Sequence, residues 1–173
     1  MTSLLAHYAH RADASLAPSL RNGIAPLLLR LVVGYGFLWH GWAKLDRGPE
    51  LFAATLHTLG VPLPLLSAWL ATSVELVGGL AILAGAYVPW VSVPLAIVLQ
   101  TALLTVHLPY GFPSVRLVEV SESAIKFGPV GYEVVLLYLG ALGAIAFGGP
   151  GPWSVDHWRR HRAQLRESGD PRS

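Results

Sequence analysis

Four titratable side chains near the ends of apolar segments carry the strongest chemical signal in this sequence: His40, Lys44, His107 and Glu133. Histidine titrates close to neutral pH and can take up or release a proton, and a lysine ammonium can stabilise an anionic ligand. His40, His107 and Glu133 belong to three different apolar segments and fall at one predicted depth. This convergence predicts a polar pocket that faces outward.

The predicted pocket has catalytic residues and residues that contact a ligand. The predicted catalytic residues are His40, His107 and Glu133, and the predicted ligand contacts are Phe37, Trp39, Lys44, Gln100 and Tyr132. Gln100 lies two helical turns before His107, which places both side chains on one face of an ideal helix. A packed polar network that only holds the helices together is the alternative interpretation of the same residues.

Two further charges, Arg30 and Glu75, lie in the interior of apolar segments. A charge at the centre of a bilayer costs about 2.5–3.5 kcal/mol on insertion scales, so such groups usually find a partner inside the protein. We therefore predict a structural ion pair between Arg30 and Glu75 that fixes the register of two neighbouring helices. A proton relay or a headgroup contact is the functional alternative. Asp156 follows a run of glycines and prolines and is predicted to lie outside the buried set.

Four segments are long and apolar enough to position these residues across a membrane. The chain has 173 residues, of which 53% are hydrophobic and only 13% are charged. The predicted spans cover residues 24–43, 66–87, 90–108 and 130–147. We therefore predict an all-α membrane protein: a bundle of four transmembrane helices with a short interfacial helix over 50–59. A long loop joins spans three and four, and residues 114–120 within it are predicted to form a short strand.

The distribution of basic residues predicts the domain organisation and the orientation. Residues 1–23 form an N-terminal arm without a cleavable signal peptide, 24–152 the membrane domain, and 153–173 a basic tail. The arm and the tail together carry seven arginines, whereas the two loops at the opposite side carry four basic residues. This asymmetry predicts a multi-pass protein of a bacterial or archaeal inner membrane with both termini in the cytoplasm. The basic tail could contact anionic lipid heads, and the alternative is that it is only the positively charged flank that sets the orientation.

Small residues along the predicted spans indicate where helices approach one another closely. One stripe at helical spacing consists of Arg30, Gly34, Phe37, Gly41 and Lys44. Its glycines would admit a neighbouring backbone. Gly78 and Gly79 on the second span, and Gly140 and Gly143 on the fourth, are predicted to act in the same way. The chain has no cysteine, which excludes thiol chemistry and makes any redox function depend on a bound carrier or a partner.

Six sequence pieces in a fixed order resemble the DoxX family. They are R-x3-G-x5-HGWAK (30–44), LG-P (59–62), VELVGGLAILAG (74–85), HLPYGF (107–112), FGPVGYEVVLLYL (127–139) and G-x-GPWSVD (149–156). The resemblance implies a four-helix membrane bundle. The family is named for a small subunit of archaeal membrane enzymes that pass electrons from thiosulfate to quinone, so it also implies a role beside redox enzymes.

The resemblance and the predicted pocket together favour a membrane subunit of a quinone-linked oxidoreductase, of the thiosulfate:quinone type or another. A quinone headgroup would occupy the pocket, and a soluble or membrane redox partner would act with it. Self-association is a further expectation, and nucleic acid is not an expected partner. A non-enzymatic membrane anchor, or a protein that binds a ligand, a lipid or a partner, is the alternative. A third interpretation is a haem or metal site that uses His40 and His107.

Overall fold

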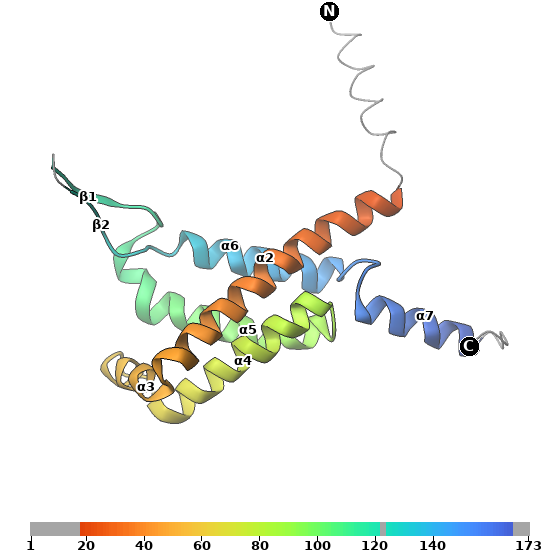
Figure 1. Ribbon diagram of the computed structural model, residues 1–173, viewed down its shortest axis with the longest axis horizontal. Helices are drawn as coiled ribbons and strands as arrows, with labels where there is room; N and C mark the ends of the chain where they lie inside the picture. The colour runs from red at the N-terminus through yellow and green to blue at the C-terminus, as the bar shows by residue number, and fades with distance from the viewer. Residues whose placement is uncertain (1–17, 122–123, 168–173) are drawn as a thin grey trace, which may run out of the picture.

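The computed structural model describes residues 18–121 and 124–167, which are mostly helical (Figure 1). The helices are α2 (Pro18–Arg47), α3 (Pro49–Thr58), α4 (Pro64–Ala84), α5 (Val88–Ala102), α6 (Glu133–Gly148) and α7 (Val155–Glu167). A π-helical turn (Leu103–His107) and a short 3-10 turn (Leu108–Tyr110) extend α5. The strands β1 (Leu117–Val120) and β2 (Ile125–Phe127) form an antiparallel hairpin between α5 and α6.

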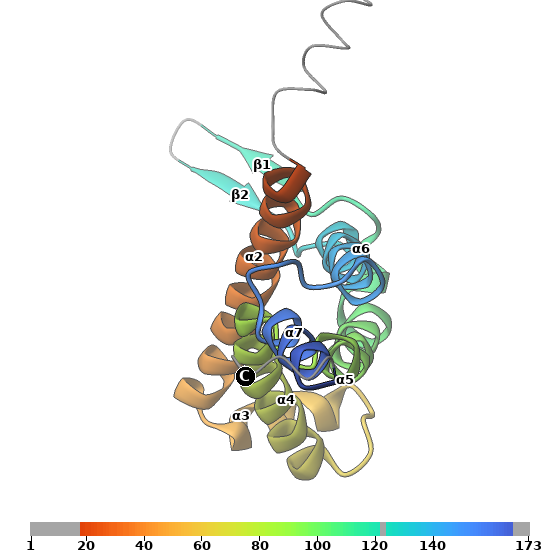
Figure 2. The same ribbon diagram turned by 90° about the vertical axis from the view of Figure 1, so that its right-hand side faces the viewer.

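The four apolar helices form a ring in which each helix packs on two others. α2 contacts α4 and α6, and α5 contacts the same two helices, so α2 and α5 lie on a diagonal of the bundle (Figure 2). The segments Asn22–Arg47, Pro64–Ala84 and Val88–Tyr110 are long and apolar enough to cross a membrane, and α6 is an apolar helix of 16 residues. This architecture confirms the predicted all-α membrane fold.

Prolines and glycines set the ends of the helices, as the sequence indicates. Pro64 and Pro89 lie in the first turns of α4 and α5, where a missing backbone N–H costs nothing. Gly85 ends α4 in the left-handed conformation, with φ 66°. The connection from α4 to α5 is therefore a tight turn, which fixes these two helices as antiparallel neighbours.

The glycine stripe of α2 lies against α4, as predicted. A Cβ atom at Gly34 would lie 2.7 Å from Leu83 Cγ and 2.9 Å from the Gly79 carbonyl oxygen, and a Cβ at Gly79 would meet the Gly34 oxygen at 2.9 Å. The two backbones therefore touch where both residues lack a side chain. Gly41 is equally close to Leu76. This contact holds α2 and α4 together over most of their shared length.

The prediction for the glycines of the fourth span is wrong. A Cβ at Gly140 or Gly143 would meet nothing within 4 Å. α6 instead packs through larger residues, among them Leu142 and Ile145, which join the buried core with Phe37 of α2. Small residues late in an apolar helix are thus not sufficient evidence for a close helix contact.

The two ends of the bundle carry different additions. At one end α3 packs on α4 through Ala53 and Leu56, so the predicted interfacial helix covers the bundle while Leu51 stays exposed. The β1–β2 hairpin projects from the same end, and its strand confirms the prediction within 114–120. At the other end lies α7, a helix in the region that the sequence predicts only as a basic tail (Figure 1).

We predict that Gly34→Ala destabilises the protein and that Gly140→Ala does not. The added methyl at Gly34 would collide with α4, and overpacking of this kind costs about 1–3 kcal/mol. The same methyl at Gly140 meets open space and improves helix propensity by up to ~1 kcal/mol. Thermal unfolding of both variants in detergent measures the difference. Equal melting temperatures would contradict the close contact between α2 and α4.

Candidate functional site

Arg30 is buried in the bundle and binds four backbone carbonyl groups. Its Nε donates to the Ile82 oxygen at 3.1 Å, and Nη2 donates to the Leu83 oxygen. Its Nη1 donates to Pro150 at 3.1 Å and to Trp153 at 2.7 Å. The side chain is only 3% exposed. One guanidinium thus joins the last turn of α4 to the segment between α6 and α7.

The predicted ion pair between Arg30 and Glu75 is wrong. The last carbonyl groups of a helix have no partner within that helix, and they carry the negative end of its dipole. A guanidinium has five N–H donors in a fixed fork, which suits several carbonyl groups better than one carboxylate does. The prediction considered only a charged partner for Arg30, so it overlooked the backbone carbonyl groups at the end of α4.

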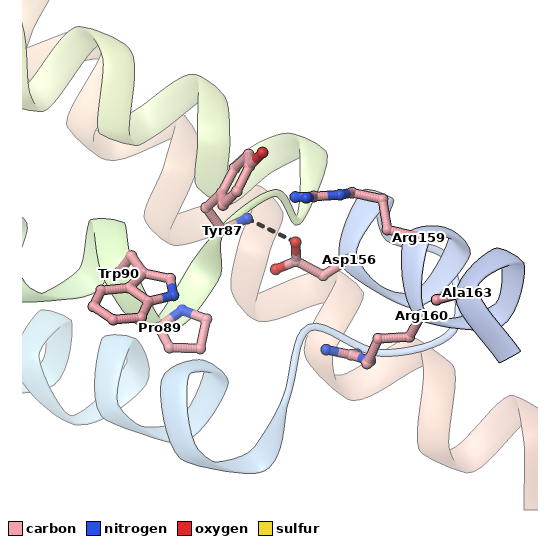
Figure 3. A pocket seen from close by; sticks show the side chains of 7 residues that line it. All are labelled: Tyr87, Pro89, Trp90, Asp156, Arg159, Arg160 and Ala163. Atoms are coloured by element: carbon pink, nitrogen blue, oxygen red, sulfur yellow. Dashed lines mark hydrogen bonds between the residues drawn. The ribbon is translucent and has the colours of Figure 1, made fainter. Parts of the chain in front are cut away.

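Asp156 is buried, so the prediction that it lies outside the buried set is also wrong. Its carboxylate accepts a hydrogen bond from the backbone N–H of Tyr87 at 2.8 Å (Figure 3). It accepts a second one from the N–H of Val88 at 3.0 Å. Its own N–H donates to the Gly85 oxygen at 3.0 Å. Asp156 therefore caps α5 from outside that helix and holds Tyr87 in a left-handed conformation, with φ 51°.

Glu75 forms an ion pair with Lys44 instead of Arg30. The two groups come from α4 and α2, and the carboxylate side chain is 6% exposed while that of Lys44 is 22% exposed. The Lys44 ammonium also lies 4.9 Å from the centre of the Phe52 ring of α3. The pair therefore ties three helices together at the α3 end of the bundle, and part of the Lys44 side chain stays exposed.

His107 and Glu133 fasten the base of the β1–β2 hairpin. His107 Nδ1 lies 2.9 Å from the Val130 oxygen, and Glu133 Oε2 accepts from the Ser114 N–H at 3.0 Å. The Ser114 hydroxyl in turn accepts from the N–H of Val134 at 3.1 Å. The reciprocal contacts of Ser114 with Glu133 and Val134 resemble a capping box at the start of α6. Both titratable groups, His107 and Glu133, thus have an architectural partner.

The structure does not bring the predicted catalytic residues into one cluster. His40 is exposed on α2, whereas His107 and Glu133 lie at the α5–α6 corner; within 18–121 and 124–167 no three His, Asp or Glu side chains gather. Phe37 is buried against Tyr138, Tyr132 packs on Phe112, and Gln100 and Trp39 are exposed. The third alternative, a haem or metal on His40 and His107, stays a prediction: His40 is exposed on α2, and His107 Nδ1 lies near the Val130 oxygen.

A pocket that sequence reasoning missed lies at the other end of the bundle. It has a volume of about 430 Å³ and is open to the surface between the start of α5 and α7 (Figure 3). Its lining includes Tyr87, Trp90, Asp156, Arg159 and Arg160. The amphipathic spacing of the arginines in 155–167 is the signal that could have indicated a helix here.

We predict that Lys44→Met destabilises the protein more than Lys44→Met combined with Glu75→Leu. The single change leaves a buried carboxylate without its partner, which typically costs about 3–5 kcal/mol, and the double change removes both charges. Arg30→Leu combined with Glu75→Leu serves as the control, since those residues have separate partners and their effects should add. Unfolding in detergent measures all variants. Rescue of Arg30→Leu by Glu75→Leu would contradict the observed pairing.

Comparison with known proteins agrees with this architecture. Residues 25–108 match the model of the DoxX family, which covers most of α2, all of α3 and α4, and α5 to the end of its π-helical turn. No curated protein and no solved structure matches the chain. The match includes the Arg30–Lys44 stripe and the Glu75 segment that carry the resemblance. The chain is a multi-pass membrane protein, and its residues 25–108 are similar to the DoxX family.

Proposed function

We propose that this protein is a non-catalytic membrane subunit of an oxidoreductase, which holds a partner protein at the membrane through the β1–β2 hairpin. The observation that carries the proposal is the exposed apolar surface of the hairpin. All seven residues of β1 and β2 are exposed, and Val118, Val120 and Phe127 are each about two-thirds exposed. Contiguous exposed apolar surfaces of this kind usually mark interaction sites.

A two-stranded hairpin needs further contacts to be stable. Isolated hairpins are marginal in water, and they gain stability from a third strand or from packing on an apolar surface. An open sheet edge also presents unpaired backbone N–H and C=O groups, which hydrocarbon cannot satisfy. A strand or loop of a partner protein satisfies both requirements, which favours a protein over lipid as the occupant.

The base of the hairpin supports a docking role because it is firmly held. The contacts of His107 with Val130 and of Glu133 with Ser114 fix both chain segments where they leave the bundle. A Cβ at Gly131 would lie only 2.2 Å from the Gly111 oxygen, so the two segments also pass each other closely. The hairpin is thus presented in a defined direction, which lowers the entropic cost of binding. The resemblance to the DoxX family supports our proposal that the partner is an oxidoreductase.

The charge asymmetry supports the orientation that we propose. α7 and its arginines lie at one end of the bundle, and α3 with the hairpin lies at the other (Figure 1). By the positive-inside rule the α7 end faces the cytoplasm of a bacterial or archaeal cell. The hairpin then meets its partner outside the cytoplasm.

We predict that a photo-crosslinker at Val118 captures an oxidoreductase polypeptide in native membranes. Phe147 on α6 is 96% exposed and provides the matched control, since it is an exposed apolar residue outside the hairpin. Val118→Asp should reduce co-purification of that polypeptide roughly ten-fold, because it places a charge in an apolar contact. Mass spectrometry of the adducts measures the result. Lipid adducts alone at Val118, or equal capture from Phe147, would contradict docking at the hairpin.

A quinone ligand is the second candidate, and the Lys44–Glu75 pair favours it. The Lys44 side chain is partly exposed, and its ammonium could donate a hydrogen bond to a quinone carbonyl group, with His40 one helical turn earlier on α2. His107 and Glu133 do not fit such a site, because each already has a backbone partner. Any quinone contact would therefore involve α2 and α4, and it would supply a membrane electron acceptor for the partner.

We predict that organic extraction of the purified protein yields quinone if this second candidate is correct, and that Lys44→Met lowers its amount several-fold through loss of the donor. Arg47→Gln, which changes a nearby exposed charge on α2, is the control. Chromatography with absorbance detection measures the quinone per protein chain. A yield no higher than that of an unrelated membrane protein from the same cells would exclude the site.

A further inference from the structure

The pocket between α5 and α7 has the chemistry of an anion-binding site. Arg159 and Arg160 extend from α7 toward Tyr87 and Trp90 at the start of α5 (Figure 3). Within 18–121 and 124–167 the ion pairs are Lys44–Glu75 and Lys126–Glu119, so neither arginine is neutralised by a carboxylate. Both guanidinium groups therefore remain available to a ligand.

The two arginines differ in how they are held. The Arg159 guanidinium lies 4.4 Å from the centre of the Tyr87 ring, a cation–π contact that restrains it beside the pocket. Asp156 also lines the pocket, but two backbone N–H groups occupy its carboxylate oxygens. The Asp156 carboxylate thus serves to cap α5. The two arginines therefore make the pocket attractive to an anion.

The position of the pocket indicates a ligand that lies in the membrane interface. It opens at the first turn of the span Val88–Tyr110, where lipid headgroups meet the hydrocarbon. Trp90 is 80% exposed there, as expected for an aromatic residue at the interface. Val93 and Ile97 follow at helical spacing and are 60% and 58% exposed. Together they give an apolar track that leads from the pocket along α5.

We propose that this pocket binds the phosphate headgroup of an anionic phospholipid, whose acyl chains lie along the exposed face of α5. A planar guanidinium matches the geometry of a phosphate through paired hydrogen bonds, and two such groups line the pocket. The volume of about 430 Å³ is in the range of small-molecule sites. The apolar track distinguishes a lipid from a free phosphate ion. This site is independent of the proposed docking function.

The test uses the full chain in nanodiscs that contain equal amounts of phosphatidylglycerol and phosphatidylcholine. Native mass spectrometry after release into detergent counts the retained lipids. We expect the unmodified protein to retain phosphatidylglycerol, and Arg159→Gln with Arg160→Gln to reduce that retention roughly ten-fold or more. Arg162→Gln with Arg166→Gln is the control, since it removes the same charge from α7 without touching this pocket.

Three results would overturn the proposal. Equal losses in both double variants would show that the whole basic helix attracts lipid without a specific site. Retention of phosphatidylcholine in equal amount would show that the phosphate contact gives no selectivity. Displacement of the bound lipid by millimolar inorganic phosphate would identify a soluble anion as the ligand. Thermal unfolding of every variant confirms that the bundle is intact, which is expected because both arginines are exposed.

Discussion

The capping of the α4–α5 turn by side chains from elsewhere is the constraint on which the bundle depends. A helix end at the membrane interface leaves backbone groups that have no partner within the helix and that hydrocarbon cannot satisfy. Arg30 satisfies the carbonyl groups at the end of α4, and Asp156 satisfies the amide groups at the start of α5. Each charge also suits the helix dipole at its position. The turn is therefore closed by electrostatics as well as by its own tight backbone.

These two side chains also determine where the rest of the chain lies. Arg30 binds Pro150 and Trp153, so the segment after α6 must pass over the end of α4. Asp156 then follows at the start of α7 and brings that helix against α5. The pocket that we propose for a lipid headgroup is a consequence of this path, because Asp156 and the contact of Arg159 with Tyr87 hold α7 beside the start of α5. At the opposite end the Lys44–Glu75 pair performs a similar task for α2, α3 and α4.

The sequence predicted the helices well and the partners of their polar residues poorly. Hydropathy and proline positions locate the spans because lipid imposes a length and an apolar composition on each. The partners of Arg30 and Asp156 are backbone groups, which have no signature in residue types. The π-helical turn is another reason why the positions of polar side chains were poorly predicted. Gln100 and His107 share a face only if α5 stays regular to its end. Extra residues in that turn change the direction of every side chain that follows.

The distance in sequence between the α4–α5 turn and its Asp156 cap has a consequence for biosynthesis. A ribosome releases the turn long before it releases Asp156, so the first three spans enter the membrane with the start of α5 uncapped. The amide groups of Tyr87 and Val88 must then be solvated at the interface until the last apolar helix has been inserted. The C-terminal segment thus closes the α4–α5 turn last, and a chain truncated before Asp156 would lack the cap of α5.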